Sequence, residues 1–456
     1  MWQPHTRRTF LGRSILGASS ALLAACSKAI PGSDLRQVSP IPMGTAPESV
    51  DASRFATQWP IKHVVILMKE NRTFDHMYGR FPGSNGVTVG IDKGRERPLA
   101  RASDGAVGDI EHCYPCALDC LNGGEMDGFN RDDPAERNAY TQFWPHDLPN
   151  YWHWAQEYAL ADNFFTSALG PSFPNHLYMI AAQSGGAHDN PVQDVEELRR
   201  RHRRTGLFKP WGCDSIEGAY IEIDHGESGI EEVFPCFEFD TVGDLLDREQ
   251  IPWAYYSAAQ NQNGYLWSAY DAIHHYRADA KLWRSRVFPV DNLVRDIHDG
   301  LLPPVTWVTP RFEVSDHPGY SLCHGENWTT EVVNAVMQSP MWRDTAIFIT
   351  WDDYGGFYDH VRPPELDRFG LGFRVPLLVL SPYAKRGAVT SELGEFSSLA
   401  RFIEDNWGLP QLTERDRLAT PMLSAFDFTQ PPRPPDVRPA RTDCKGPEYP
   451  ATTPAV

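Results

Sequence analysis

The chain has 456 residues, of which 41% are hydrophobic and 12% aromatic, a composition typical of a globular protein with one or two large cores. Its formal net charge of −18 at pH 7 argues against a nucleic-acid-binding protein, because phosphate binding depends on clustered Lys and Arg. The one basic run, RRRHRR at 199–204, is typical of a solvated loop or helix face, with contact to anionic lipid or substrate as the alternative.

The first 26 residues have the pattern of an export signal. The twin-arginine sequence TRRTFL precedes the apolar run SILGASSALLAA, which is too short to span a bilayer. LAAC then places Cys26 where a lipoprotein carries its lipid, and two acyl signals give stable membrane attachment. We therefore expect a twin-arginine lipoprotein signal over 1–26 and a periplasmic or cell-surface protein anchored through Cys26. An ordinary cleaved signal with an incidental cysteine is the alternative.

Two Pro-rich segments flank the expected catalytic domain at 59–427. Residues 27–58 are rich in Pro and Ser and predict a tether, and residues 428–456 predict a polyproline-like tail. Seven cysteines follow Cys26, and in an exported chain they favour disulfides, with one thiol left over. The trio in CYPCALDC (113–120) leaves a zinc site as the less favoured interpretation.

Strand and helix signals alternate through the domain. Continuous apolar runs typical of strands buried on both faces lie at 61–70, 304–309, 344–353 and 375–383. Helical spacing occurs at 329–342 and again at 397–408, where Gly408 is placed as a C-cap. This alternation predicts a three-layer α/β/α sandwich with a mostly parallel central sheet.

Polar residues follow two of the expected strands. Glu70 and Asn71 come after the first run, and Asp352 and Asp353 end the run DTAIFITWDD. Binding sites in parallel sheets gather at the carboxyl ends of strands, so these four side chains should meet there. Buried carboxylates are costly unless a positive charge lies beside them, and this predicts a cation.

Four sequence blocks carry a resemblance to a known family. LMKENRTFDHMYG (67–79), NGGEMDGF (122–129), LGPSFPNHLY (169–178) and TWDDYGGFYDHVRPP (350–364) resemble, in order, the signature blocks of the bacterial phosphoesterase family. That family includes phosphatidylcholine-type phospholipases C and related acid phosphatases. The resemblance spans roughly residues 60–410 and implies an alkaline-phosphatase-like core.

The resemblance also implies a metal site and a nucleophile. By position it makes Glu70, Asn71, Asp352 and Asp353 ligands of one divalent metal ion, and it makes Ser172 both nucleophile and fifth ligand. Carboxylate and amide oxygens are hard ligands that suit Ca²⁺, Mg²⁺ or Mn²⁺. A serine hydroxyl is a weak nucleophile near neutral pH, and metal coordination can activate it.

Four histidines are candidates for protonating the leaving alcohol or stabilising phosphoryl oxygens. His317 and His112 match family histidines near the phosphate, and His274 and His275 lie where the family has polar or histidine residues. A histidine titrates in the pH range that such roles require. For any single histidine the alternative is an ordinary surface or core residue.

Other residues of the blocks are expected to support the site. Arg72 and Asp75 are expected to brace the loop after the first strand, and Asn175 could orient Ser172 or only satisfy its own turn. Structural or core roles are expected for Asp127, Asp359, His360, Tyr151, Trp152 and Trp154. The sequence departs from the family at EFSS (395–398), where Phe396 replaces a histidine.

These observations favour an exported, metal-dependent phospholipase C-type hydrolase that forms a phosphoserine intermediate. An acid phosphatase acting on small phosphomonoesters and a non-catalytic surface-binding lipoprotein are the alternatives. The expected partners are a phospholipid or small phosphoester substrate and the membrane; the oligomeric state is left open. The mature chain lacks the C-x-P-x-R segment of sulfatases and the G-x-S-x-G elbow of serine esterases.

Overall fold

The computed structural model describes residue 35, residues 37–130 and residues 135–445. Its centre is an eight-stranded sheet, and in this sheet only β13 runs antiparallel to its neighbours. In spatial order the strands are β10 (Val287–Pro289), β9 (Trp253–Ser257), β11 (Val305–Val308), β1 (His63–Lys69), β12 (Thr345–Trp351), β13 (Leu377–Leu380), β6 (Ala159–Ala161) and β14 (Ala388–Thr390).

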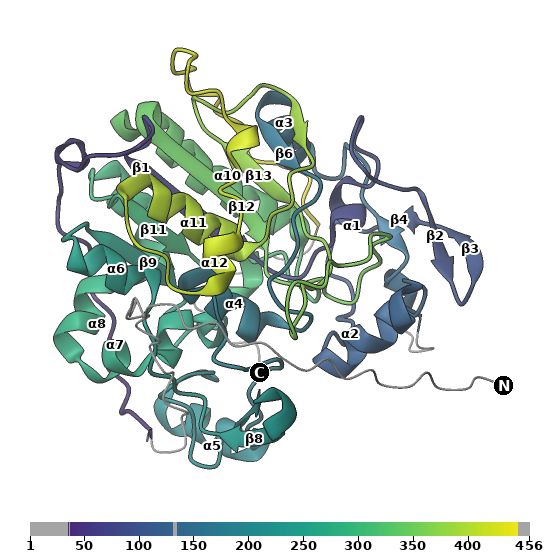
Figure 1. Cartoon of the computed structure of the whole chain (residues 1–456), viewed down its shortest axis with the longest axis horizontal. Helices are drawn as coiled ribbons and strands as arrows, with labels where there is room; N and C mark the ends of the chain where they lie inside the picture. The colour runs from purple at the N-terminus through teal and green to yellow at the C-terminus, as the bar shows by residue number, and fades with distance from the viewer. Residues whose placement is uncertain (1–34, 36, 131–134, 446–456) are drawn as a thin grey trace, which may run out of the picture.

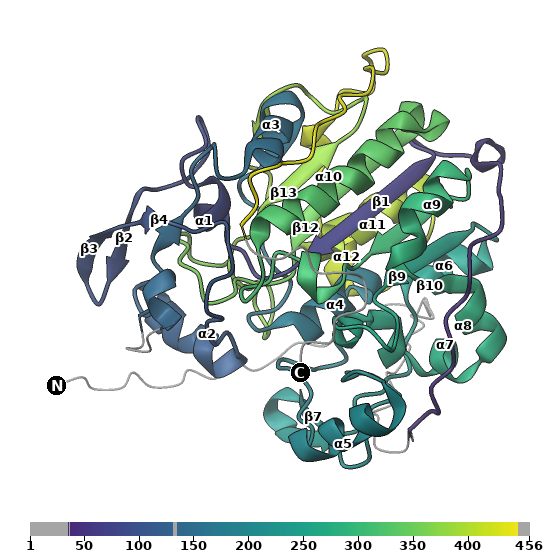
Figure 2. The same cartoon turned by 180° about the vertical axis from the view of Figure 1, so that it is seen from behind.

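Helices cover both faces of this sheet (Figures 1 and 2). One face carries α4 (Ser172–Ala181), α6 (Val242–Arg248) and α11 (Phe396–Trp407), and the other carries α3 (Pro149–Glu157), α9 (Leu293–His298) and α10 (Leu322–Gln338). Every residue of β1 and β12 is buried, as expected for central strands covered on both sides. The predicted α/β class with a mostly parallel sheet is confirmed.

Shorter elements surround the sheet on its rim. The remaining helices are α1 (Phe74–Tyr78), α2 (Tyr114–Leu121), α5 (Val195–Thr205), α7 (His274–Ala278), α8 (Ala280–Arg286) and α12 (Glu414–Leu418). Three two-stranded sheets pair β2 (Val89–Asp92) with β3 (Arg95–Pro98), β4 (Ala100–Arg101) with β5 (Thr141–Gln142), and β7 (Ile221–Asp224) with β8 (Ile230–Val233).

Two helix predictions can be compared with the structure directly. Helix α11 ends at Gly408, which has φ +69, so the predicted C-cap is confirmed. Helix α10 begins at Leu322, seven residues before the expected start at 329. Its first turns contain Gly325, which weakens the helical signal, yet a Cβ at this position would lie 1.8 Å from Asp316 Oδ1.

The two Pro-rich flanks lie against the domain over the residues that the structure describes. The N–H of Val38 donates to Cys213 O at 2.7 Å, and the N–H of Gly44 donates to Val287 O at 2.9 Å. At the other end, Cys444 forms a disulfide with Cys323. Both flanks are therefore attached to the folded domain along much of their length.

Disulfide formation is confirmed for six of the seven cysteines that follow Cys26. The pairs are Cys113–Cys116, Cys213–Cys236 and Cys323–Cys444, and Cys120 is buried outside them. With two of the CYPCALDC sulfurs joined to each other, the structure does not favour the zinc interpretation. The signal sequence and Cys26 lie outside the described residues.

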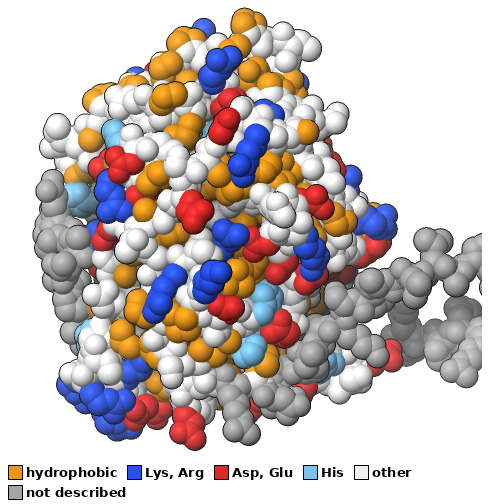
Figure 3. Space-filling model, turned by 90° about the vertical axis from the view of Figure 1, so that its left-hand side faces the viewer, with side chains coloured by type: hydrophobic (Ala, Val, Ile, Leu, Met, Phe, Trp, Pro, Cys, Tyr) orange, Lys and Arg blue, Asp and Glu red, His pale blue; other side chains and the backbone are white. Residues whose placement is uncertain are grey.

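The surface shown in Figure 3 mixes acidic, basic and apolar side chains. The basic run at 199–204 lies in α5, where Arg199 and Arg200 form ion pairs with Glu196 and Glu197 at 2.6 Å each. Among the helices of the described residues, none is long and apolar enough to cross a membrane.

Candidate metal centre and active site

The ends of β1 and β12 place two pairs of polar residues side by side. Glu70 and Asn71 follow β1, and Asp352 and Asp353 follow β12. Because the two strands pair in parallel along their whole length, both pairs leave the sheet at the same edge. The N–H of Asn71 donates to Asp352 Oδ1 at 2.9 Å, and all four side chains are buried.

A glycine in the turn after β12 allows these two chain segments to approach closely. Gly355 has φ +56, and a Cβ there would lie 2.6 Å from the Cβ of Asn71. The N–H of Gly355 donates to Asp353 Oδ1 at 2.7 Å. Asn71 itself has φ +62, a conformation that asparagine adopts more readily than most residues.

Ser172 enters the same site from the first position of α4. Its hydroxyl donates to Asp353 Oδ2 at 3.2 Å and lies 3.4 Å from Glu70 Oε2. The turn before α4 is fixed by Asn175, whose amide nitrogen donates to Pro171 O at 3.1 Å and whose oxygen accepts from Ala168 N at 3.0 Å. Asn175 thereby orients the turn that presents Ser172.

His176 is a site residue that the sequence reasoning missed. Its Nε2 lies 3.0 Å from Glu70 Oε1 and 3.8 Å from Asp352 Oδ2, and these three residues form a group that could hold a metal ion. Burial lowers the pKa of His176 to about 4, so it is neutral at pH 7. Its position four residues after Ser172 puts both side chains on one face of α4, a signal available in the sequence.

The buried carboxylates of this site lack a Lys or Arg partner. Among the described residues, Glu70, Asp352 and Asp353 form ion pairs only with histidines. Two other buried carboxylates do have a permanent cation beside them, Asp359 with Arg374 at 3.1 Å and Asp316 with Lys69 at 3.3 Å. Burial, followed by the neighbouring carboxylates, raises the pKa values of Glu70 and Asp353 well above their ordinary range.

Two features of the site fit a divalent cation. Asp352 Oδ2 is buried and has no hydrogen-bond partner among the described residues. In one of its two orientations the Asn71 amide oxygen faces Glu70 Oε2 at 3.2 Å and Asp352 Oδ1 at 3.1 Å, a crowding of oxygens that a bound cation would relieve. The donor set of carboxylate, amide and hydroxyl oxygens matches the preference of hard divalent ions.

Two of the predicted histidines reach the site. Nε2 of His112 and Nε2 of His317 each lie 3.0 Å from the same atom of the Asn71 amide group, which is Nδ2 in that orientation. His112 Nε2 is also 3.8 Å from Asp353 Oδ2. Burial lowers the pKa of His112, but Asp353 and Asp109 raise it more, so its pKa lies above the ordinary value. Burial lowers the pKa of His317.

The other two predicted histidines lie elsewhere. His274 and His275 begin α7, where their Nδ1 atoms lie 3.2 Å and 2.6 Å from the carboxylate of Glu238. Nε2 of His275 lies 3.0 Å from Asp244 Oδ1. Within the described part of the chain, neither forms a hydrogen bond or ion pair with the oxygens of the site, so the geometry does not support a catalytic role for them.

Asp316 is a buried carboxylate that contacts the last residues of both central strands. Its carboxylate accepts from Trp351 Nε1 at 3.1 Å and Tyr151 OH at 2.9 Å, and it lies 3.3 Å from Lys69 Nζ. Lys69 and Trp351 end β1 and β12, so each directly precedes a candidate metal ligand, and Asp316 itself precedes His317. One buried carboxylate therefore links three of the segments that build the site.

The residues expected to brace the first loop do so. Arg72 is buried and donates to Asn71 O at 2.9 Å. Asp75 lies 2.6 Å from His360 Nδ1 and forms an ion pair with Arg374, which also pairs with Asp359. Asp75, Asp359 and His360 form a second group close enough for a metal ion, but the guanidinium of Arg374 already supplies the positive charge.

The expected core and structural residues are buried, except His360, which is half-buried. Tyr151, Trp152 and Trp154 belong to the core, and Phe396, in the position of the family histidine, is buried in α11. Asp127 accepts from Asn122 Nδ2 at 2.7 Å, a local structural contact.

Comparison with known proteins defines the class of enzyme, the hydrolases that act on phosphoester bonds. The chain belongs to the phosphoesterase family, whose model matches residues 61–410. It is 25% identical to Phospholipase C B of Mycobacterium tuberculosis, over 82% of this chain and 79% of the relative. It is 26% identical to Hemolytic phospholipase C of Pseudomonas aeruginosa, over 92% of this chain and 62% of the relative.

Similarity extends to a plant protein and to solved structures. Non-specific phospholipase C6 of Arabidopsis thaliana is 26% identical, over 85% of this chain and 75% of the relative. A protein in the alkaline phosphatase superfamily from Vibrio parahaemolyticus matches with a TM-score of 0.33 and 9% identity, over 82% of this chain and 72% of that one. A structural similarity this low carries no argument about function.

Proposed function

We propose that this protein is a metal-dependent phosphoester hydrolase of the phospholipase C type, with Ser172 as its nucleophile. The observation that supports this most is the Ser172 hydroxyl, which points from the start of α4 into three buried carboxylates that have no Lys or Arg partner among the described residues. A hydroxyl beside a cation is the arrangement needed for covalent attack on phosphorus.

The proposed metal ligands are oxygens of Glu70, Asn71, Ser172, Asp352 and Asp353, and His176 lies beside them. When bound, a divalent cation supplies Lewis-acid polarisation of a phosphoryl oxygen and lowers the pKa of a hydroxyl.

The chain's own residues account for the proton transfers. The Ser172 hydroxyl gives its proton to the Asp353 carboxylate 3.2 Å away as the Oγ–P bond forms and the bond from phosphorus to the leaving oxygen breaks. His112 or His317 donates a proton to the leaving alcohol. Water then attacks the phosphoserine and gives a proton to the histidine that protonated the alcohol. The Oγ–P bond breaks, the phosphate product leaves, and Asp353 returns its proton to the Ser172 oxygen. Positioning and charge stabilisation dominate phosphoryl transfer, and the buried site supplies both.

Similarity to several phospholipases C supports a phosphodiester substrate, and an acid phosphatase is the second candidate. Purified protein should hydrolyse phosphatidylcholine and bis(para-nitrophenyl) phosphate, and dialysis against chelator should abolish the activity until a divalent ion is returned. Hydrolysis of para-nitrophenyl phosphate alone would instead identify a phosphomonoesterase. Absence of all three activities in metal-loaded protein would contradict the proposal.

Two variants separate the nucleophile from the metal site. Ser172→Ala should lower turnover at least about a thousandfold, or roughly 4 kcal/mol of barrier, while the metal stays bound. Asp353→Ala should abolish both metal binding and turnover. An Asp353→Ala protein that stays active after dialysis against chelator would contradict the proposed site.

We also propose that the protein is exported and anchored by lipid at Cys26, with residues 27–58 as the connecting segment. The support is the sequence TRRTFL followed by LAAC. Cys26→Ser should move the protein from the membrane fraction to the soluble fraction of fractionated cells. Wild-type protein found unmodified and wholly soluble would contradict the anchor.

A further inference from the structure

The C-terminal strap, residues 436–445, is bound to α10 by two pairs of hydrogen bonds from asparagine side chains of the helix. The Asn334 amide donates to Arg438 O at 2.7 Å and accepts from Arg438 N at 2.9 Å. Two turns earlier, Asn327 donates to Arg441 O at 2.9 Å and accepts from Arg441 N at 2.6 Å. These amides pair with the strap as a neighbouring strand would, and the Cys323–Cys444 disulfide closes its end.

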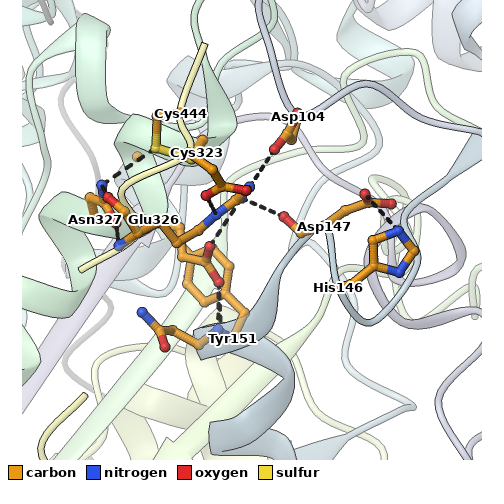
Figure 4. A network of polar contacts seen from close by, with 12 residues as sticks. Asp104, His146, Asp147, Tyr151, Cys323, Glu326, Asn327 and Cys444 are labelled. Atoms are coloured by element: carbon orange, nitrogen blue, oxygen red, sulfur yellow. Dashed lines mark hydrogen bonds and ion pairs between the residues drawn. A yellow bond between two sulfur atoms is a disulfide. The ribbon is translucent and has the colours of Figure 1, made fainter. Parts of the chain in front are cut away.

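The Arg441 side chain connects three separate segments. Figure 4 labels its partners Asp104, Asp147 and Glu326, one from each segment. The side chain of Arg441 is 6% exposed, and its guanidinium donates to Asp104 Oδ2 at 2.6 Å and to Asp147 O at 2.6 Å. It also lies 3.5 Å from Glu326 Oε2. Asp104 lies before α2, Asp147 before α3 and Glu326 within α10, so one side chain holds together three parts of the wall around the site.

The contact with Asp104 leads to His112. The backbone oxygen of Asp104 accepts from Cys323 N at 3.2 Å and Ser321 Oγ at 3.1 Å. Three residues further on, Val107 O accepts from Gly319 N at 2.6 Å. The segment 104–112 is thereby docked on the segment 317–323, and its last residue reaches Asn71.

Through Glu326, Arg441 is connected to Tyr151 and Asp316, the residues that hold the chain next to His317. Glu326 is buried, and its Oε1 accepts from the N–H groups of Asn150 and Tyr151 at 2.8 Å and 3.0 Å, at the start of α3. The Tyr151 hydroxyl donates to Asp316, the residue before His317. Arg441 is the positive charge nearest to Glu326 among its described contacts, so removing it would leave that buried carboxylate uncompensated.

We propose that Arg441 is a positioning residue for the reaction, and that the C-terminal strap acts through it to hold His112 and His317 against Asn71. This inference rests on the proposed function, because its kinetic consequence requires that these histidines assist the leaving group. Arg438 offers a matched control on the same strap. Among the described residues, its side chain makes one long hydrogen bond, from Nε to Asn150 Oδ1 at 3.5 Å, and does not contact Asp104 or Glu326 as Arg441 does.

The kinetic test compares four variants on phosphatidylcholine, whose leaving alcohol, unlike nitrophenolate, must be protonated. Arg441→Ala and Asp104→Asn should each lower kcat about tenfold or more with KM within about twofold, because substrate contacts are retained while the assisting groups are misplaced. Arg441→Lys should be intermediate, since it keeps the charge but cannot bridge two partners, and Arg438→Ala should equal wild type. An Arg441→Ala enzyme within twofold of Arg438→Ala would overturn the inference.

A double-mutant cycle separates positioning from general stability. In a background that lacks both histidines, His112→Ala with His317→Ala, Arg441→Ala should lower kcat by less than about threefold, because the groups that it positions are already absent. Loss of the full tenfold in that background would show that Arg441 does not act through these histidines and would overturn the inference. Should Arg441→Ala fail to fold, Asp104→Asn replaces it in both measurements.

Hydrogen exchange tests the strap without any reference to activity. Backbone amides of 104–112 should exchange at least about tenfold faster in Arg441→Ala than in wild type, while those of β1 stay unchanged. Unchanged exchange at 104–112 would overturn the inference. If wild-type protein showed no hydrolysis, the proposed function would fail, whereas this measurement would still decide whether Arg441 holds the segment.

Discussion

At the scale of single residues, the site gathers three buried carboxylates, Glu70, Asp352 and Asp353, that have no Lys or Arg ion-pair partner within the described residues. Asp359 is buried beside Arg374, and Asp316 beside Lys69. Within the described residues, the basic side chain beside Glu70 and Asp352 is His176, which is neutral at pH 7 and supplies no positive charge, and Asp352 Oδ2 has no hydrogen-bond partner there. Such a cluster is stable when a cation completes it, and this difference is the physical basis for the proposed metal centre.

His176 gives the first prediction. His176→Ala should weaken divalent-metal binding by about tenfold to a hundredfold, because it removes the group that orients or completes the Glu70 ligand. His176→Gln should retain more affinity, since its amide can still donate to Glu70. Isothermal titration with the divalent ion measures both. Wild-type affinity in His176→Ala would contradict this role.

His275→Ala is the matched comparison for that experiment. The His275 ring contacts Glu238 and Asp244 and not the metal-site oxygens, so its removal should change neither metal affinity nor turnover. A large loss of turnover in His275→Ala would mean that sequence position had identified a catalytic histidine that the geometry does not bring to the site.

The second prediction concerns which histidine protonates the leaving alcohol. Substituting that residue by Ala should slow hydrolysis of an alkyl phosphodiester at least about a hundredfold, but a nitrophenyl ester far less, because nitrophenolate leaves without a proton. His112→Ala and His317→Ala are compared on both esters. Equal losses on the two esters in both variants would contradict general-acid catalysis by either histidine.

Sequence reasoning reached some of these residues and not others. Glu70, Asn71, Asp352 and Asp353 follow apolar runs, and the strand-end rule brings such residues together. The support from Asp316 was not predictable, since it depends on tertiary contacts with the last residues of two distant strands. His274 and His275 were suggested by block position, which does not reveal that they face Glu238.

At the scale of elements, the turn after β12 sets the geometry of the site. Gly355→Ala should reduce metal binding and turnover at least about tenfold, because the added Cβ would lie 2.6 Å from the Cβ of Asn71 and must displace it. Titration with the metal ion and steady-state kinetics measure the loss.

Gly94→Ala is the control for that prediction. Gly94 lies between β2 and β3 with φ +73, but a Cβ there meets nothing within 4 Å. Both variants carry the strain of a left-handed residue, and only Gly355→Ala adds the clash. Equal metal affinities in the two variants would show that the close approach to Asn71 does not matter.

Element boundaries were predictable where local signals were strong. The runs at 61–70 and 344–353 gave the two central strands, and Gly408 marked the end of α11. The start of α10 was missed because Gly325 weakens the helical signal. The need for glycine there comes from a close approach of the Asp316 carboxylate, a tertiary contact that no helical spacing in the sequence indicates. The antiparallel direction of β13 likewise depends on connections that apolar runs do not encode.

At the scale of the whole molecule, the disulfides should contribute unequally to stability. Cys323–Cys444 joins residues 121 apart, and Cys113–Cys116 joins residues 3 apart. Because cross-links over longer loops restrict the unfolded chain more, Cys323→Ser with Cys444→Ser should lower the free energy of unfolding by about 2–5 kcal/mol. Cys113→Ser with Cys116→Ser should lower it less. Denaturant unfolding of both double variants checks the order, and a reversed order would contradict this account.

The overall architecture followed from the alternation of strand and helix signals, but the attachment of the C-terminal segment did not. Pro-rich composition predicted a polyproline-like tail and indicated no contacts for it, whereas the described residues of that segment pair with Asn327 and Asn334 and end in a disulfide. A high proline content predicts an extended backbone. It does not indicate that two asparagine side chains of α10 bind this extended segment.

The central claim is that Ser172 attacks phosphorus and forms a phosphoserine. The stereochemical course of hydrolysis at a chiral phosphorus tests it most directly, because each in-line displacement inverts configuration. A phosphorothioate diester of known configuration, hydrolysed in isotopically labelled water, should give product with net retention, since attack by Ser172 and then by water amounts to two inversions. Net inversion would require a single displacement by water and would contradict the account, even if the metal centre were confirmed.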